Sequence, residues 1–385
     1  MSKRANNEGS IRQRSDGRWE ARITIGIDPK TGKPKRRSIY GSSQAEVRKQ
    51  LTKLTKAIDE GTYQEPNKLT VGQWLDNWLI TYCHNLKPLT QSSYKVVINK
   101  HLLPNIGGIK LQDLRPIHIQ KFYNDLVDSG YSPKTVSNIG GVLGKALSDA
   151  FKEMLIPFNP CDHVTLPKKV RKEIKPLSDS EIPLFLEAIK SDPFENAFAV
   201  ALFAGLREGE LLGLCWDNVD FENKRLHICQ QLQKEKSSPK YYILKTTKSG
   251  ADRTIQPPDI CFEYLHAEKI RQLNNQFSAG RAWNNNDNLV FTDNLGSHLA
   301  FFTFWKHFKT IAEKIGRPDA RPHDLRHSCA TLALAAGSDI KSVQGLMGHS
   351  TPSFTLSVYA HSSAKMQEDT AARMQNYYDN LKKQA

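Results

Sequence analysis

Five side chains in the second half of the chain are of the types that can cut a phosphodiester bond. Arg207 follows a glycine break, His323 and Arg326 lie three residues apart, and His349 precedes Tyr359 by ten residues. A phosphodiester is an anion whose transition state gathers charge on the non-bridging oxygens, and the planar fork of an arginine can bind two such oxygens. We therefore expect Arg207 and Arg326 to stabilise that charge. A phenol such as Tyr359 has an ordinary pKa of about 10, so it needs a nearby base or cations to act as a nucleophile.

These residues stand in four motifs, which are an Arg box at 204–211, an HxxR box at 323–326, a Leu-Met-Gly-His box at 346–349 and a tyrosine at 359. In this order and spacing the motifs resemble those of the tyrosine recombinase family. The layout of the whole chain resembles the integrase branch of that family, which includes lambda-type integrases and those of conjugative transposons. The resemblance implies cleavage through a covalent 3′-phosphotyrosine at Tyr359, with His323 handling a proton and His349 bonding the phosphate. It also implies that the reaction uses no metal, ATP or other cofactor.

The family uses a lysine on a β-hairpin turn as the acid for the leaving 5′ oxygen, and two lysines compete for that role here. Lys248 stands directly before the turn at 249–250 and the strand-like run 253–255. Lys245 matches a Lys-Thr pattern of the family. We prefer Lys248 and keep Lys245 as the alternative. Met347 departs from the family, in which leucine or another small apolar residue usually precedes Gly-His, but this change should not affect the chemistry.

His323 and His327 raise the competing hypothesis of a metal site. They lie four residues apart and would share one face of a helix, as zinc ligands often do. No cysteine or carboxylate completes a ligand set beside them, so we expect no metal site and assign His327 a structural role. Glu210, inside the Arg box, is likewise expected to be a structural partner.

Composition narrows the class of protein. The chain has 385 residues and a formal net charge of +14, which favours a polyanionic partner such as nucleic acid. The longest apolar run, 197–206, is far shorter than the ~18 residues that span a bilayer, and the first ten residues do not resemble a secretory signal. The six cysteines never form a CxxC pair, which is typical of reduced thiols. With the resemblance, these features predict a bacterial cytoplasmic protein at the nucleoid, not a membrane protein.

Residues 1–65 are predicted to form an N-terminal domain that binds arm-type DNA sites. The first 60 residues hold 15 Lys and Arg against seven Asp and Glu. Strand-like runs and turns precede a helix that Ser43 would cap, with Glu46 three residues later. One sheet face could be basic and enter a major groove, although a solvated charged hairpin is the alternative. The expected DNA contacts are Arg12, Arg14, Arg22, Arg36 and Arg37.

Residues 66–165 are predicted to form an all-helical core-binding domain. Helices are expected after Thr70, near Thr90, over 117–127 and from Ser132-Pro133. At the start of the last of these helices, Lys134 and Thr135 suit phosphate contacts, although ordinary solvated polar residues are the alternative for each of them taken singly. Residues 166–176 form a basic linker, in which Lys169 and Arg171 could follow a DNA backbone or simply face solvent.

Residues 177–385 are predicted to form a mainly helical catalytic domain with a small β-sheet at about 225–256. A tail helix follows, whose apolar stripe would dock on a neighbouring protomer or fold back onto its own, and consists of Met366, Met374, Tyr377 and Leu381. The expected fold class is therefore multidomain α+β: a three-stranded sheet with a helix, an all-helical domain, and the catalytic domain.

The sequence thus predicts a site-specific DNA recombinase of a mobile element, with integrase and excisionase activity. By resemblance it would clamp double-stranded DNA between its helical and catalytic domains and act as a homotetramer on two duplexes, at core and arm sites. A type IB topoisomerase, which relaxes one duplex as a monomer, is the alternative with the same chemistry; the basic N-terminal domain and the Leu-Met-Gly-His box favour the recombinase. A non-catalytic DNA-binding regulator would not need Tyr359 and its partners.

Overall fold

The computed structural model describes residues 9–27, 31–60, 63, 65–169, 175–234, 242–246 and 252–348, together with 374, 375, 379 and 382. Several residues singled out above lie outside this part of the chain, namely Arg171, Lys248, His349, Tyr359, Met366, Tyr377 and Leu381. The chain divides into two compact units, Met1–Arg171 and Lys172–Ala385. Among the described residues, no helix is long and apolar enough to cross a membrane.

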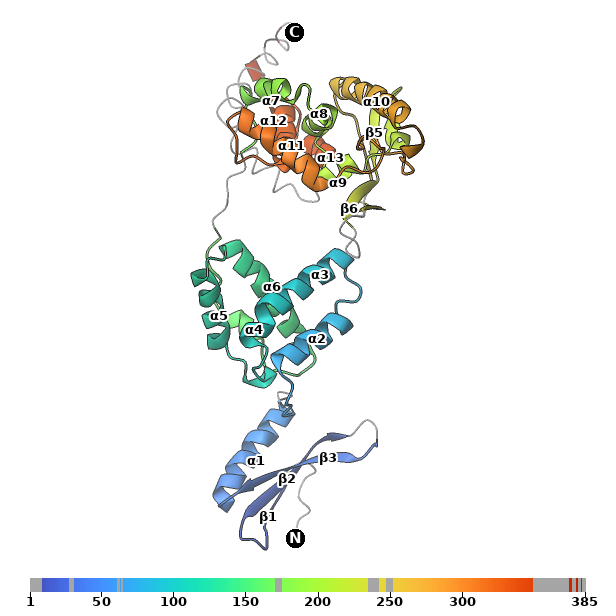
Figure 1. Cartoon of the computed structure of the whole chain (residues 1–385). Helices are drawn as coiled ribbons and strands as arrows, with labels where there is room; N and C mark the ends of the chain where they lie inside the picture. Colours follow the sequence, from blue (N-terminus) through green and yellow to red (C-terminus); the bar gives the residue numbers. More distant parts are fainter. Residues whose placement is uncertain are drawn as a thin grey trace. The chain divides into compact units, whose positions relative to one another are not determined.

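The first unit begins with a small sheet covered by one helix (Figure 1). Strands β1 (Ser10–Gln13), β2 (Trp19–Ile27) and β3 (Pro34–Gly41) are antiparallel, in the order β1-β2-β3. Helix α1 (Gln44–Asp59) starts where the Ser43 hydroxyl accepts a hydrogen bond from the Glu46 backbone N–H at 3.3 Å, as predicted. Alternate residues of β2 pack on α1 and form a core of Ala21, Ile23, Val47 and Leu51.

The rest of the first unit is helical, with a core of its own. Thr70 and Ser132 cap helices at the predicted places, while α3 starts at Pro88, two residues before Thr90, because proline fits the first turn of a helix. Trp78, fully buried, donates to Asp149 at 2.9 Å and so joins the first and last of these helices. The helices are α2 (Val71–Thr81), α3 (Pro88–Val97), a π-helical segment (Ile98–Leu102), α4 (Leu103–Ile106), α5 (Pro116–Asp128) and α6 (Pro133–Lys152).

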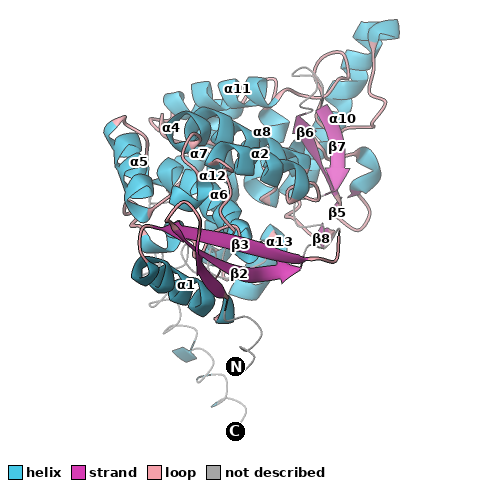
Figure 2. Cartoon of the chain, turned by 90° about the horizontal axis from the view of Figure 1, so that it is seen from below, coloured by secondary structure: helices cyan, strands magenta, loops and turns pink. Residues whose placement is uncertain are grey.

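The second unit combines helices with short antiparallel strands (Figure 2). One sheet has the order β4-β5-β8, and β6 pairs with β7. The strands are β4 (Val219–Asp220), β5 (Arg225–Ile228), β6 (Gln230–Lys234), β7 (Tyr242–Thr246) and β8 (Arg253–Ile255). The helices are α7 (Glu181–Ile189), α8 (Glu195–Ala204), α9 (Glu208–Leu212), α10 (Ile260–Ala279), α11 (Phe301–Lys314), α12 (Pro322–Ala335) and α13 (Ile340–Met347). Together with the first unit, these elements confirm the multidomain α+β fold class.

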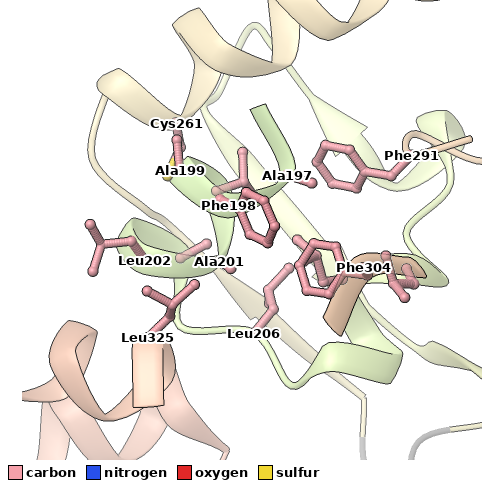
Figure 3. Close-up of a cluster of buried hydrophobic side chains, with 14 of the residues drawn as sticks. Ala197, Phe198, Ala199, Ala201, Leu202, Leu206, Cys261, Phe291, Phe304 and Leu325 are labelled. Carbon is pink, nitrogen blue, oxygen red and sulfur yellow. The ribbon is translucent and has the colours of Figure 1, made fainter. Parts of the chain in front are cut away.

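Helix α8 is the centre of the second unit. Its residues 197–202 and 204 are buried, as expected for a helix that is apolar on every side. Phe198 of α8 faces Phe304 of α11, with ring centroids 4.6 Å apart, and Leu325 of α12 lies below the same helix (Figure 3). This packing fixes the end of α8, which leads into Arg207, against α12, which carries Arg326.

Candidate active site

Arg207 lies in the tight connection between α8 and α9. Gly205 ends α8 with a φ of +62°, and a Cβ there would lie 2.3 Å from the Met347 side chain and 2.9 Å from the Cys329 sulfur. Only glycine therefore fits this junction. Arg207 is the N-cap residue of α9, and its backbone N–H donates to the Glu210 carboxylate at 3.0 Å. Its side chain keeps 27% of its surface exposed, so a ligand can reach it.

Arg326 approaches the same junction from α12. Its side chain is 2% exposed, and its guanidinium donates to the carbonyls of Gly205, at 2.6 Å, and Met347. The pKa of Arg326 falls to about 9. The largest cause is burial of the side chain and the second is the charge of Arg207, while the carboxylate of Glu210 opposes the shift. Arg326 is therefore still charged at neutral pH, and the structure brings it together with Arg207.

Glu210 is the group that the two arginines share. Its side chain is 1% exposed and accepts from Arg207 Nη1 at 2.5 Å, while Arg326 Nη1 lies 3.9 Å from its other oxygen. Arg253 of β8 adds a bidentate pair, with Nη2 and Nη1 donating at 2.6 and 3.1 Å. Burial alone would raise the pKa of Glu210, but the hydrogen bonds and charges of Arg253 and Arg207 lower it to about 2. One buried carboxylate thus neutralises part of a cluster of three arginines.

His323 and His327 lie on one face of α12, as their spacing predicts. Their rings meet edge to face, with centroids 4.7 Å apart. His323 is exposed, whereas His327 is 7% exposed. Partial loss of hydration, followed by the charge of Arg326, lowers the pKa of His323 below its ordinary value, so it is neutral at pH 7 and can accept a proton. In the described part of the chain, no third His, Cys, Asp or Glu joins them in a group that could hold a metal.

The strands around the candidate lysines pair differently from the predicted hairpin. Within the described residues β7 pairs with β6, and β8 pairs with β5, so β7 and β8 do not form a hairpin with each other. Thr246, the last residue of β7, is paired with Gln230 of β6. Lys245 is exposed near that end, and Lys248 falls outside the described residues. Because a Cβ on Gly213 would lie 2.4 Å from the Leu232 nitrogen, the β6–β7 pair packs closely on the segment that follows the Arg box.

The predicted DNA-contacting arginines of the first unit divide between the two faces of its sheet. Arg12, Arg22 and Arg36 alternate with the residues that pack on α1 and so lie on the opposite face. Arg14 is exposed near this face, with its guanidinium 5.4 Å from the Tyr40 ring centre. Arg37 is next to Arg36 and therefore points to the other side of the sheet, where it donates to the Tyr63 hydroxyl at 3.1 Å.

Outside the sheet, the other predicted contacts differ in how free they are. Lys134 and Lys169 are exposed. Thr135 is half-buried, and both its backbone N–H and its hydroxyl are engaged with the Ser132 hydroxyl, at 3.2 and 2.9 Å. The backbone N–H and the hydroxyl of Thr135 are therefore already hydrogen-bonded at the N-cap of α6, which limits their use for binding a phosphate.

Two residues of the basic sheet face and the arginine cluster, Glu20 and Arg253, were not predicted from the sequence. Glu20 is buried in the basic sheet face, where it accepts from Arg12 at 2.8 Å, Arg22 at 2.9 Å and Ser38 at 3.0 Å. The pKa of Glu20 falls to about 2, mainly because of the hydrogen bond from Arg12. Burial opposes this shift, and the hydrogen bond from Arg22 adds to it. Arg253 is the other. Strand alternation offered a signal, because Arg253 shares a face with buried Ile255 and so required a buried acidic partner.

Comparison with known proteins gives consistent matches along the chain. Residues 175–366 match the model of the phage integrase family, and residues 70–127 match the phage integrase N-terminal SAM-like domain. The chain is 29% identical to a tyrosine recombinase XerC-like protein of Caldanaerobacter subterraneus, over 94% of this chain and 96% of the relative. It is 24% identical to the ICEBs1 integrase of Bacillus subtilis, over 95% and 99%.

Two solved structures share the fold. The Tn1549 transposon integrase in complex with a circular intermediate DNA has a TM-score of 0.68 and 21% identity, covering 79% of this chain and 99% of that one. A lambda integrase tetramer bound to a Holliday junction has a TM-score of 0.57 and 18% identity, covering 92% and 96%. From the motifs, the arginine cluster and these matches, we conclude that the chain belongs to the phage integrase family of tyrosine recombinases.

Proposed function

We propose that this site-specific DNA recombinase cuts and rejoins the DNA of a mobile element with Tyr359 as nucleophile and Arg207 and Arg326 as the charge-stabilising pair. The observation that carries the proposal is the shared carboxylate of Glu210, which gathers the two arginines from helices far apart in the sequence. A structural ion pair would not need a second and a third guanidinium at one carboxylate. Such a concentration of positive charge suits a phosphodiester at the exposed edge of Arg207.

The reaction can be written with side chains of this chain alone. The Tyr359 oxygen attacks the phosphorus, the bond from phosphorus to the 5′ oxygen breaks, and the phenolic proton passes to His323. Lys248 protonates the departing 5′ oxygen, and His349 donates a hydrogen bond to the phosphate. The products are a 3′-phosphotyrosine and a free 5′ hydroxyl. A 5′ hydroxyl from another strand reverses the step, because the covalent bond keeps the energy of the phosphodiester.

The DNA partner would engage the chain at several places. We propose that residues 1–65 bind arm sites through the sheet face of Arg12 and Arg22, and that residues 66–165 and 177–385 bind the core site from opposite faces. Residues 166–176 would link them along the backbone. The basic excess supports a nucleic-acid partner. Acting on DNA of a mobile element would place the protein in the bacterial cytoplasm, at the nucleoid.

A homotetramer on two duplexes is the proposed active assembly. A lambda integrase of the same fold has been solved as a tetramer on a Holliday junction. If the tail helix after residue 363 docks on a neighbour, its deletion should reduce multimeric complexes on DNA more than monomer binding. Gel-shift titrations measure both species, and unchanged assembly would refute docking in trans. The topoisomerase and regulator alternatives gain no support from the comparisons.

The test of the function is covalent trapping. Wild-type protein is incubated with a library of nicked duplexes in EDTA, and DNA that stays attached after denaturation is sequenced. We expect protein at the 3′ end and a free 5′ hydroxyl, and no covalent complex with Tyr359→Phe, which should still bind DNA. Cleavage that strictly required Mg²⁺, or that persisted in Tyr359→Phe, would contradict the proposal. The recovered sequence provides the substrate for the experiments below.

A further inference from the structure

Arg253 contacts both the acid and the turn that organise the two arginines of the site. Its fork holds both oxygens of Glu210, at 2.6 and 3.1 Å, and its Nε donates to the Leu346 carbonyl at 3.3 Å. We propose that Arg253 is a positioning residue for DNA cleavage, which keeps Arg207 aimed at the scissile phosphate by saturating Glu210. This inference rests on the proposed function, because it assumes that Arg207 binds that phosphate.

The geometry explains why saturation matters. Glu210 has two oxygens and three guanidinium neighbours, and Arg253 is the one that takes both oxygens at once. Arg207 is thereby held through Nη1, while its Nη2 donates to the Gly348 carbonyl at 3.0 Å. The second oxygen of Glu210 also accepts from the Arg207 backbone N–H at 3.0 Å, and without Arg253 its remaining acceptor capacity would be open to the fork of Arg207. A carboxylate that chelates Arg207 would turn that fork inward and neutralise the charge intended for the phosphate.

Arg253 also supports the turn that leads to His349. Gly348 ends α13 with a φ of +59°, and a Cβ there would lie 2.9 Å from Arg253 Cδ. The aliphatic stem of Arg253 therefore packs against this glycine, and its head group bonds the preceding carbonyl of Leu346. The same turn provides the carbonyls that accept from Arg207 and Arg326. One side chain thus connects β8, the Arg box and the end of α13.

The burial of Arg253 agrees with a positioning role. Its side chain is 12% exposed, compared with 27% for Arg207, so a phosphate would reach Arg207 more readily. The two Nη atoms of its fork bond Glu210 while its Nε bonds the Leu346 carbonyl, and a lysine ammonium cannot reproduce this combination. Arg253→Lys should therefore keep the charge and lose the bidentate geometry, whereas Arg253→Ala loses both.

The experiment measures single-turnover formation of the covalent complex on the nicked substrate recovered by trapping. Full-length wild type, Arg253→Ala, Arg253→Lys and Arg207→Ala are compared, with Arg225→Ala as the matched control. Arg225 is an exposed arginine of neighbouring β5. We expect cleavage by Arg253→Ala to be about 10- to 100-fold slower, the loss caused by a misplacement of roughly 1 Å, with DNA affinity little changed. Arg253→Lys should be intermediate and Arg225→Ala unchanged.

A neutral substrate separates positioning of Arg207 from a merely structural role. Replacing one non-bridging oxygen of the scissile phosphate with a methyl group removes the negative charge that Arg207 must stabilise. On this methylphosphonate, Arg253→Ala and Arg253→Lys should cleave at nearly the wild-type rate, as Arg207→Ala should. If Arg253→Ala does not fold, Arg253→Lys carries the same comparison.

Two outcomes would overturn the inference. Wild-type cleavage of the ordinary substrate by both Arg253 variants would show that saturation of Glu210 is unnecessary. Slow cleavage of both substrates by a folded variant would show that Arg253 acts through the fold or through another step. In either case, rescue of Arg207→Ala by the methylphosphonate would leave the proposed function intact, whereas its failure to be rescued would count against the proposed function itself.

Discussion

Replacing Glu210 with glutamine should cost the second unit about 3 kcal/mol of stability at neutral pH. The pKa of Glu210 falls from 4.5 to about 2 in the folded chain, and each pKa unit is worth about 1.4 kcal/mol. Because the side chain is 1% exposed, solvent screening does not reduce this figure greatly. The value also lies at the lower end of the roughly 3–5 kcal/mol lost when a buried ion pair is broken. Glutamine keeps the shape and one acceptor, but not the charge that three arginines share.

The stability difference between wild type and Glu210→Gln should depend on pH. A carboxyl group with a lowered pKa in the folded state contributes its full stability above the unfolded pKa and loses it as the pH falls towards the folded pKa. The difference between wild type and Glu210→Gln should therefore stay near 3 kcal/mol down to about pH 5. It should then shrink between pH 4.5 and about 2, where Glu210 itself becomes protonated.

Urea unfolding at several pH values, followed by hydrogen exchange of peptides, measures this difference. Peptides from α8 and α12 report on the unit that contains Glu210, and peptides from α2 and α6 report on the other unit in the same sample. The matched control is Glu187→Gln, since Glu187 pairs with Lys190 at the surface, where an ion pair contributes little. A difference that did not change with pH, or a variant as stable as wild type, would refute the electrostatic account of the cluster.

Four further results are expected. Deleting residues 1–65 should weaken DNA binding and reduce its salt dependence but spare cleavage of a core-site substrate; complete loss of cleavage would contradict the domain division. A substrate with sulfur at the bridging 5′ position, which leaves without a proton, should rescue Lys248→Ala, and rescue of Lys245→Ala instead would move the acid. Glu20→Gln should bind random DNA at least as well as wild type but discriminate arm sequences less, because two sheet arginines lose their anchor; competition assays with unchanged discrimination would argue against this. In an NMR titration without DNA, the pKa of His323 should lie below that of an ordinary histidine, and an ordinary value would contradict the combined effect of lost hydration and the charge of Arg326.

Local signals allowed much of the fold to be predicted. The caps at Ser43, Thr70 and Ser132 appear in the structure because a short side chain satisfies backbone N–H groups only a few residues away. The apolar run at 197–206 excluded only a membrane span, and the structure shows that most of it forms α8, the buried centre of the second unit. Pairing of strands is not local in this sense. The partner of β7 is β6, and the sequence around Lys248 resembled a hairpin turn although β7 and β8 do not pair in the described part of the chain.

The motifs of the sequence by themselves determined the family and the chemical types of the site, because the reaction requires particular side chains in a fixed order. Only the tertiary structure decided which groups surround them. Glu210 belongs to the Arg box, but its third partner, Arg253, comes from β8, and the acceptors of Arg326 are backbone carbonyls of Gly205 and Met347. Backbone acceptors leave no trace in residue types. The arginines that pair with Glu210 can be identified only from the structure, because the packing of α8, α12 and β8 brings them within a few ångströms of its carboxylate. At that distance, charge and desolvation act together.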